Sequence, residues 1–465
     1  MTEGVAMNCT RRGFIGSVAA VGMGVGDGWV PSAPAVEYRR SIPVEREVDV
    51  FVAGGGPAGI AAALAARRGG ASVFLAEASG AFGGAATAAY VPAFATFTDG
   101  KDVVVGGIGM EIRRLVSKDV PVGSWWTPID MEELKRTYDD LVSGSGVEFS
   151  FFTSLCDAFA RGGRMEHAIL STKRGLVAVR ARVFIDCTGD GDLVAFAGGA
   201  FEKGDEEGSL MPATLCSQWS DIDFAQQDAW PQSRVAEAIR DGVFSVPDPH
   251  LPGFFRRKDD KSSLGRGNIG HVFGVDPTDE RSLTKAMVDA RRRMPEYERF
   301  FKGYLKGYSR MQLASTAPFL GVRESRRIVC DRMMTIDDFM ARASFADGIG
   351  RYCYPVDLHA AKPGREEFEK FWKDYSSRLT YKSGESYGIS FASLVPKSFE
   401  NVLVAGRCIG ADRGMQASLR VMPCCFITGQ AAGTAAAMAL ACGGETRKVD
   451  VSALRQRLRS SGACI

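Results

Sequence analysis

The sequence has little of several features that would narrow its function at once. Its four histidines (His167, His250, His271 and His359) show no metal-ligand spacing, and its 11 cysteines include no C-x-x-C or ferredoxin-like run. We therefore predict no metal site. The net charge is only +2 with 24% charged residues, so no strong field points to a nucleic acid. We see no run of the roughly 20 apolar residues that a spanning helix needs, and expect no stable membrane insertion.

The N-terminal 35 residues resemble a targeting segment rather than part of the fold. Paired arginines, Arg11 and Arg12, precede a modest glycine-rich apolar run, and Ala33-Pro34-Ala35 offers small residues for cleavage. This pattern resembles a twin-arginine export signal, which predicts a periplasmic or otherwise extracytoplasmic protein. The alternative is a disordered basic tail. Residues 36–47 are predicted to be a linker.

The most informative stretch follows at residues 49–65. An apolar run with β-branched residues breaks into glycines and then becomes alanine-rich, as a buried strand does when it turns tightly into a helix. Gly54, Gly56 and Gly59 fill the three positions of G-x-G-x-x-G. The first glycine allows the tight turn, the second lets the backbone approach a pyrophosphate, and the third lets helix and strand pack closely.

Two features downstream support a nucleotide-binding turn. A second strand, residues 71–76, ends in Glu77, where a carboxylate would accept hydrogen bonds from ribose hydroxyls. Gly83-Gly84 then offers a second stretch of backbone without side chains. The alternative is a structural α/β turn with no ligand.

The pattern then changes to β between residues 147 and 183. Strands are predicted at 148–152, 168–172 and 176–181, with a hairpin connection at 173–175. Another buried strand, 181–186, runs into Thr188-Gly189, and acids at positions 190 and 192 sit where they could cap a helix.

Residues 201–387 carry more charge, aromatics and proline, and are the predicted substrate domain. Amphipathic helices are predicted at 279–304 and 365–379. Arg323 and Arg326 lie in an arginine-rich stretch, where fixed ion pairs and substrate clamps are both open interpretations. His359 is equally open to a structural or a functional role.

The chain then returns to strand and glycine near its C-terminus. A strand at 401–405 leads into Gly406-Arg407, and a long helix is predicted at 426–440. Gly429, Ala432, Gly433 and Ala436 give this helix a small face for close packing. Its N-terminus would direct a positive dipole end at a bound ring system.

Together these motifs resemble the FAD-dependent oxidoreductase family related to the flavoprotein subunit of heterodisulfide reductase. The resemblance implies an α/β fold: a glutathione-reductase-like, Rossmann-type FAD-binding domain (48–200 and 388–445) with an inserted α+β substrate domain (201–387) and a C-terminal tail (446–465). It implies FAD as the cofactor. The residues that it assigns to FAD are Gly54, Gly56, Pro57, Ala58, Gly59, Glu77, Ala78, Gly83, Gly84, Ala85, Thr188, Gly189, Asp190, Gly406, Arg407, Asp412, Ser418, Leu419, Arg420 and Val421.

The sequence departs from the relatives in ways that limit the chemistry. The four-cysteine iron–sulfur motif of heterodisulfide reductase is missing, and no cysteine pair follows Gly83-Gly84. A second glycine fingerprint for a nicotinamide cofactor is also missing. We therefore expect hydride exchange between flavin N5 and a small organic substrate (a carboxylate, polyol or sugar), with a separate electron acceptor or donor as partner.

The expected catalytic residues are His359, Arg323, Arg326 and Arg420. The arginines would orient the substrate, and His359, with an unperturbed pKa of about 6.5, would transfer a proton.

Two alternatives remain. One is a flavin-binding electron carrier without catalysis. The other is a serine hydrolase, because residues 384–388 match G-x-S-x-G around Ser386. That motif needs a strand, an elbow and a helix, yet residues 389–391 have a strand pattern, and no histidine follows Ser386.

Overall fold

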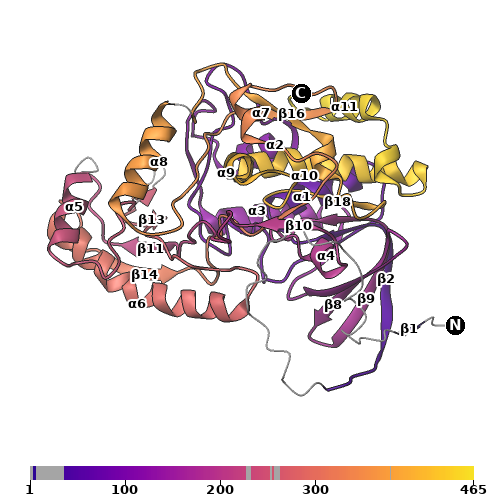
Figure 1. Cartoon of the computed structure of the whole chain (residues 1–465), viewed down its shortest axis with the longest axis horizontal. Helices are drawn as coiled ribbons and strands as arrows, with labels where there is room; N and C mark the ends of the chain where they lie inside the picture. Colours follow the sequence, from indigo (N-terminus) through magenta and orange to yellow (C-terminus); the bar gives the residue numbers. More distant parts are fainter. Residues whose placement is uncertain (1–3, 7–35, 227–231, 252–253, 256–261, 378) are drawn as a thin grey trace.

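The computed structural model describes residues 4–6, 36–226, 232–251, 254–255, 262–377 and 379–465 (Figure 1). Apart from the short strand β1 (Gly4–Ala6), the predicted export signal lies outside the described residues.

The main sheet has a parallel part and an antiparallel part that share one long strand. Parallel strands run in the order β6 (Glu148–Ser150), β3 (Val73–Ala76), β2 (Ser41–Ala53) and β9 (Gly175–Asp186). The sheet continues antiparallel through β8 (Arg164–Thr172) and β7 (Ser154–Arg161). Strand β3 and the last four residues of β2 are continuous apolar runs because both faces of the sheet are buried there.

The C-terminal part of the chain completes this sheet. Strand β18 (Val402–Val404) pairs parallel with the end of β9, with Leu403 opposite Ile185. Two segments far apart in the sequence therefore form one Rossmann-type α/β unit, as the sequence predicts.

Two helices lie side by side over this sheet (Figure 1): α1 (Pro57–Arg68) and α10 (Met422–Ala439). A Cβ on Gly429 would lie 2.2 Å from the Ala58 carbonyl oxygen, and one on Gly433 would lie 2.1 Å from that of Ala62. Only glycine permits such an approach, so the predicted small face of this helix is confirmed.

The expectation that no stretch is long and apolar enough to span a membrane needs correction. The segment Met422–Cys442, which contains α10, passes that test by length and composition. Its most apolar window is 72% buried inside the protein, where it packs on α1.

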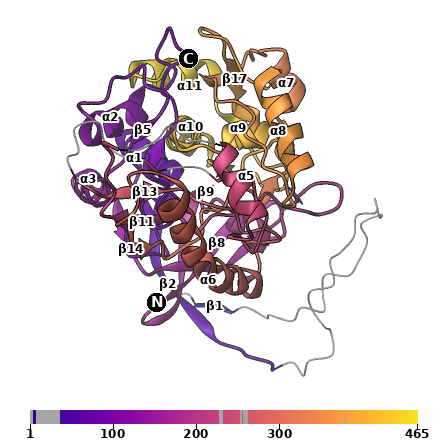
Figure 2. The same cartoon turned by 90° about the vertical axis from the view of Figure 1, so that its left-hand side faces the viewer.

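A second hydrophobic core is formed by residues 213–320. It contains a four-stranded antiparallel sheet of β12 (Phe254–Phe255), β13 (Gly265–Gly267), β11 (Ser217–Ser220) and β14 (Gln312–Thr316), with helices α5 (Gln232–Arg240) and α6 (Glu280–Tyr304). Trp219, Phe300 and Phe301 are fully buried in this core. The rotated view brings these elements in front of the main sheet (Figure 2).

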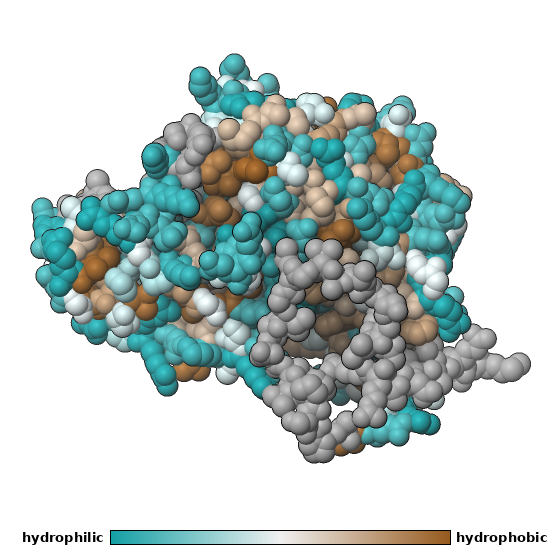
Figure 3. All heavy atoms as spheres, viewed as in Figure 1, coloured by the Kyte–Doolittle hydropathy of each residue, from teal (hydrophilic) through white to brown (hydrophobic). Residues whose placement is uncertain are grey.

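The remaining elements connect and cover these two cores. They are β4 (Ala93–Phe94), α2 (Gly107–Val116), β5 (Thr127–Pro128), α3 (Met131–Ser143), α4 (Asp192–Phe196), β10 (Phe201–Lys203), β15 (Arg326–Ile328), α7 (Ile336–Met340), β16 (Gly348–Tyr352), α8 (Arg365–Ser377), β17 (Tyr387–Ser390), α9 (Arg413–Leu419) and α11 (Val451–Ser460). On the face seen in Figure 3, hydrophobic residues form small patches separated by hydrophilic ones.

Several predicted boundaries differ from the structure. Strand β2 begins at Ser41, inside the predicted linker, because this segment pairs with β9 and buries Ile42. The predicted C-terminal tail contains helix α11, whose Leu454 and Leu458 are buried in the main core. Residues from Ile328 to Val356, predicted to belong to the substrate domain, also contribute to the main core.

Candidate functional site

The turn from β2 into α1 leaves an open space next to its second glycine. Gly54 has a φ of +93°, and a Cβ there would lie 2.6 Å from the Cys187 carbonyl oxygen. A Cβ on Gly59 would lie 1.8 Å from the Gly54 oxygen, so both glycines are required by packing. A Cβ on Gly56, in contrast, would meet nothing within 4 Å. The space beside Gly56 is where a ligand would approach the N–H groups of the first turn of α1, such as those of Ala58 and Gly59. Pro57 begins this turn and has no N–H of its own.

A second glycine loop forms another wall of this space. The Gly83 N–H donates to the Gly55 carbonyl oxygen (2.8 Å), and a Cβ on Gly84 would lie 3.2 Å from the Gly56 Cα. Both Gly83 and Gly84 have positive φ values, which favour glycine. Ala85, next along the chain, is exposed.

Glu77 stands at the end of β3, beside the same turn. Its Oε2 accepts a hydrogen bond from the Gly55 N–H and its Oε1 accepts one from the Ser79 N–H, both at 2.7 Å. Ala78, between them, is exposed. An ionised carboxylate has about four acceptor positions, so Glu77 keeps capacity for ribose hydroxyls.

The loop after β9 is held by its own carboxylates. Asp186 is fully buried and accepts hydrogen bonds from Thr188 N–H, Thr188 Oγ1–H and Val194 N–H. Burial raises the pKa of Asp186 to about 6, although these hydrogen bonds oppose the shift. Asp190, beyond the positive-φ Gly189, accepts from Arg407 Nη2 at 2.8 Å. Thr188 and Asp190 therefore shape the loop, and the ion pair ties it to the segment after β18.

The C-terminal residues assigned to FAD contribute backbone more than side chains. The Gly406 N–H donates to Thr428 Oγ1, and a Cβ on Gly406 would lie 3.0 Å from that of Ala58. Asp412 caps α9 by accepting from the Met415 N–H.

The side chain of Ser418 is also occupied by the protein, since its hydroxyl donates to the Tyr354 carbonyl oxygen and contacts Tyr387 OH. Leu419 is buried, and Val421 precedes the first turn of α10. The side chains of Asp412 and Ser418 therefore already bond to the protein, and this arrangement favours contacts from their backbone to a cofactor.

Together these groups fit a dinucleotide. They meet at the carboxyl ends of the parallel strands β2, β3, β9 and β18, where Rossmann-type sheets bind such ligands. The open space at Gly56 is bounded by a helix N-terminus and by the Gly83–Gly84 loop, and only glycine leaves that space clear. The residues present thus match the phosphate-binding part of an FAD site.

Three of the four expected catalytic residues come together in one buried cluster. Arg420 Nη2 donates to Asp357, at 2.9 Å to its Oδ2, and Asp357 Oδ1 lies 3.1 Å from His359 Nε2. Arg323 is buried and donates through Nη1 to Pro212 O and Thr214 Oγ1. It belongs to the same cluster, because its charge acts on those of Arg420, Asp357 and His359.

Burial sets the charge states in this cluster. It lowers the pKa of Arg323 to about 10, with Arg420 adding to the shift, and the guanidinium remains charged at neutral pH. Burial opposes the ionisation of Asp357, but His359, Arg420 and Arg323 hold the pKa of that carboxyl well below its usual range. Burial also holds the pKa of His359 well below its usual value, despite the opposing effect of Asp357. The expectation of a proton donor near 6.5 at His359 is therefore corrected: the imidazole is neutral.

Arg326 lies apart from the other three. Its Nη1 donates to Asp192 Oδ1 (2.7 Å) and to the Asp190 carbonyl oxygen (3.1 Å), and its guanidinium stacks on Phe201. A fixed ion pair, one of the two open interpretations, therefore describes it. The expected substrate-orienting role of Arg326 stays a prediction.

The structure also gathers residues that the sequence analysis kept separate. His250 and His271 lie against His359, with ring centroids 4.8 and 4.9 Å from it. His250 and His271 are 21 residues apart, and His271 and His359 are 88 residues apart, so their spacing in the sequence does not indicate this grouping. The repeated D-x-H pattern of Asp248-Pro249-His250 and Asp357-Leu358-His359 was the available signal.

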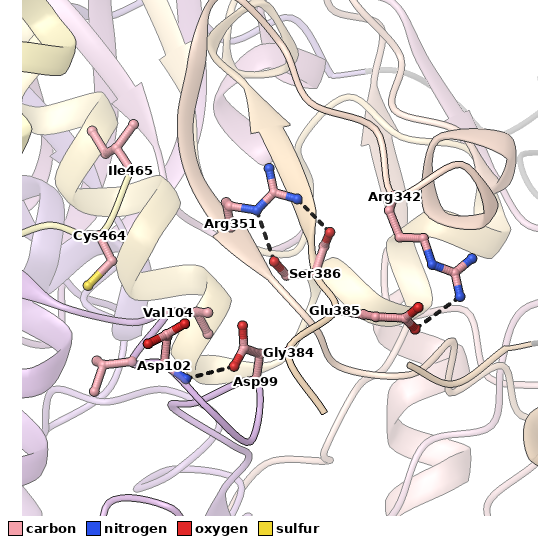
Figure 4. A pocket seen from close by; sticks show the side chains of 11 residues that line it. Asp99, Asp102, Val104, Arg342, Arg351, Gly384, Glu385, Ser386, Cys464 and Ile465 are labelled. Atoms are coloured by element: carbon pink, nitrogen blue, oxygen red, sulfur yellow. Dashed lines mark hydrogen bonds and ion pairs between the residues drawn. The ribbon is translucent and has the colours of Figure 1, made fainter. Parts of the chain in front are cut away.

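A cavity of about 530 Å³ lies elsewhere, beside the C-terminus (Figure 4). Ser386 lines it, and its Oγ accepts a hydrogen bond from Arg351 Nε at 2.9 Å. None of the described residues that line this cavity is a histidine, and strand β17, rather than a helix, follows Ser386. The serine-hydrolase alternative therefore lacks both the base and the elbow that it needs.

Four buried cysteines near the candidate FAD site are free thiols: Cys187, Cys408, Cys424 and Cys425. Burial raises the pKa of each thiol. Raised pKa values oppose formation of the reactive thiolate.

Several solved structures are distantly similar to this chain. The structure of a geranylgeranyl bacteriochlorophyll reductase-like protein from Thermoplasma acidophilum is similar over 90% of this chain and 84% of its own, with 11% identity and a TM-score of 0.44. A p-nitrophenol 4-monooxygenase from Pseudomonas putida is similar over 62% of this chain and 70% of its own, with 15% identity and a TM-score of 0.35. A flavin-dependent brominase variant is similar over 89% and 84%, with 14% identity and a TM-score of 0.41. Likenesses this distant say nothing of the substrate.

No curated protein matches the sequence. A family model described as FAD dependent oxidoreductase, however, matches residues 49–458, nearly the whole chain. With its Rossmann-type α/β fold and its glycine-lined dinucleotide site, the chain belongs to the FAD-dependent oxidoreductase family and is an FAD-dependent enzyme.

Proposed function

We propose that this enzyme oxidises or reduces a small organic substrate bearing a carboxylate, and that Arg323 and Arg420 hold that carboxylate. When bound, FAD supplies the two-electron chemistry, with hydride exchange at its N5. Polyols and sugars, which the sequence also allowed, are less well matched to two buried guanidinium groups.

The observation that carries this proposal is the unused donor capacity of the two arginines. Arg420 Nε is buried and has no hydrogen-bond partner among the described residues. Arg323 uses only Nη1 in its hydrogen bonds to other described residues. A guanidinium has five N–H donors in a fork that matches a carboxylate, so both side chains can take an anionic ligand.

Asp357 and His359 act on the substrate through Arg420 rather than directly. Asp357 accepts from Arg420 Nη2 through both its side chain and its carbonyl oxygen, which fixes the direction of the guanidinium. His359 supports Asp357 from the other side. Asp357 also offsets one of the two arginine charges.

The finer assignment of the fold also belongs to this proposal. A glutathione-reductase-like FAD domain, with the 213–320 core as an inserted α+β substrate domain, is supported by the shared sheet of β9 and β18 and by the separate second core. Relationship to the heterodisulfide reductase flavoprotein is supported by the motif order alone.

The test is an anaerobic titration of the FAD-loaded protein with matched substrate pairs. Each hydroxy acid or enoate is compared with its neutral amide, and polyols and sugars form separate arms. We expect carboxylates to bleach or restore the visible absorbance band of FAD, and their amides to act far more weakly. Reduction by polyols with no response to any carboxylate would overturn the proposal, and no organic response at all would favour the electron carrier.

Export and the electron partner are further parts of this proposal. Folding around FAD before export suits the twin-arginine route, and the paired Arg11 and Arg12 support it. Replacing both arginines with lysine should keep the protein in the cytoplasm of its host, as fractionation would show. The acceptor or donor would be a separate molecule, which assays with one-electron dyes and with NADH would distinguish. Burial of α10 against α1 supports the absence of membrane insertion.

A further inference from the structure

Three histidines from separate segments converge beside the arginine cluster. His250 lies between α5 and β12, His271 lies shortly after β13, and His359 lies between β16 and α8. Their ring centroids are 4.8 to 4.9 Å apart in all three pairs, which is nearly an equilateral triangle. Their candidate ligand nitrogens all lie within 4.8 Å of one another.

The ring-centroid spacing of this triangle matches that of a three-histidine metal site. With metal–nitrogen bonds of about 2.1 Å, tetrahedrally arranged imidazoles have ring centres about 5 Å apart. Two ligand nitrogens on one ion lie about 3.0 to 3.4 Å apart, depending on its geometry. His271 Nε2 and His359 Nδ1 are separated by 2.9 Å, close to that range.

A carboxylate stands behind two of the three rings. Asp248 Oδ2 lies 2.9 Å from His271 Nδ1, and Asp357 Oδ1 lies 3.1 Å from His359 Nε2. A carboxylate on the far nitrogen fixes the tautomer of a metal-binding histidine and orients the ring.

The proton count of this arrangement points to a cation. His271 and His359 each carry one N–H when neutral. If each donates that N–H to its neighbouring carboxylate, the nitrogens His271 Nε2 and His359 Nδ1 face each other with lone pairs at 2.9 Å. Lone pairs at that distance repel unless a proton or a metal ion lies between or beside them.

We propose that His250, His271 and His359 bind one divalent transition-metal ion of the Zn²⁺ type. Three neutral imidazoles suit such an ion, and a site with three protein ligands keeps a position for water. A cavity of about 20 Å³ adjoins the rings, lined also by Phe273 and Phe368, and it has room for one water.

The surrounding charges accommodate the ion. Asp248 and Asp357 supply two negative charges close to the rings, while Arg323 and Arg420 supply two positive ones. Lys362 also lines the cavity, but its ammonium is exposed and lies near Glu207. The ion would join the 213–320 core, through His250 and His271, to the segment that positions Arg420.

The test measures Zn²⁺ binding and needs no substrate, so it is independent of the proposed function. The full-length, FAD-loaded protein is treated with a chelator, and Zn²⁺ binding is followed by calorimetry and metal analysis. We expect one Zn²⁺ per chain in the wild type and loss of that equivalent in His250→Gln and His271→Gln. Asp248→Asn, which removes only the supporting carboxylate, should weaken binding about 10- to 100-fold.

The matched control is His167→Gln, because His167 is the one remaining histidine and lies on β8, outside the cluster. Far-UV circular dichroism and FAD content verify folding in every variant. If folded wild-type protein takes up no Zn²⁺, or if His271→Gln binds it as tightly as His167→Gln, the metal site is wrong. The wild-type titration decides the matter even if a variant does not fold.

Discussion

Replacing Gly56 with alanine should separate cofactor binding from folding. The backbone of Gly56 has φ −71° and ψ −175°, which alanine adopts freely, and the added Cβ would meet no protein atom within 4 Å. A glycine-to-alanine change at a compatible position stabilises a protein by about 0.4–1 kcal/mol through the unfolded chain. We therefore expect the FAD-free variant to be at least as stable as the wild type.

FAD binding should fall in the same variant, because the methyl group enters the space proposed for the pyrophosphate. Overpacking of this kind costs about 1–3 kcal/mol, which corresponds to roughly a 5- to 150-fold higher Kd. Calorimetric titration of FAD-free protein with FAD measures the Kd, and thermal unfolding with and without FAD measures the two stabilities.

Two further variants frame this result. Gly59→Ala places a Cβ 1.8 Å from the Gly54 oxygen and should fail at folding itself. At Gly303, in α6, an added Cβ would also meet nothing within 4 Å, so Gly303→Ala should weaken neither FAD binding nor folding. If folded Gly56→Ala bound FAD within twofold of the wild type, the reasoning about this turn would be refuted.

Three other predictions concern stability. The pKa of Asp186 is raised to about 6 in the folded state, so its contribution to the free energy of unfolding is complete below about pH 4 and is lost, by about 3 kcal/mol, as the pH rises through 6. Asp186→Asn should therefore make the unfolding midpoint depend less on pH between pH 4 and 7. Parallel plots of midpoint against pH for the variant and the wild type would contradict this. Gly433→Ala should lower the free energy of unfolding by about 1–3 kcal/mol, since its Cβ would lie 2.1 Å from the Ala62 oxygen. An unchanged free energy of unfolding would mean that α1 and α10 are not in such close contact. Arg407→Gln should lower the free energy of unfolding by about 1–3 kcal/mol, because it leaves Asp190 without its ion-pair partner. In a double-mutant cycle with Asp190→Asn, the two losses of free energy should not add.

Local patterns were sufficient to predict much of the FAD-binding unit. The β2–α1 turn and the hairpin between β8 and β9 depend on neighbours in sequence. The small face of α10 was also visible, because glycine and alanine recur there at helical spacing.

Features that depend on distant contacts were not predictable in the same way. Strand β7 was not recognised, and β9 was divided into two strands although it runs unbroken from Gly175 to Asp186. A long strand that pairs with different neighbours along its length has no uniform pattern, since its burial changes from one end to the other.

The charged residues show the same limit. Nothing in the stretch around Arg323 and Arg326 indicates that one faces Arg420 while the other pairs with Asp192. The histidine cluster depends on how the second core meets the segment around His359. Such partners are set by tertiary structure, and sequence could only name the candidates.

The measurement that tests the central claim most directly is a single-turnover experiment on Arg420→Gln under anaerobic conditions. Fully FAD-loaded protein is mixed with increasing concentrations of the best carboxylate substrate, and the visible absorbance of FAD is followed in time. We predict that the observed rate of FAD absorbance change rises much less steeply with substrate concentration in Arg420→Gln than in the wild type, and that Arg420→Lys partly recovers the wild-type slope. Arg281→Gln, whose side chain is 85% exposed on α6, should behave as the wild type. Equal rates and equal saturation in Arg420→Gln and the wild type would contradict the account.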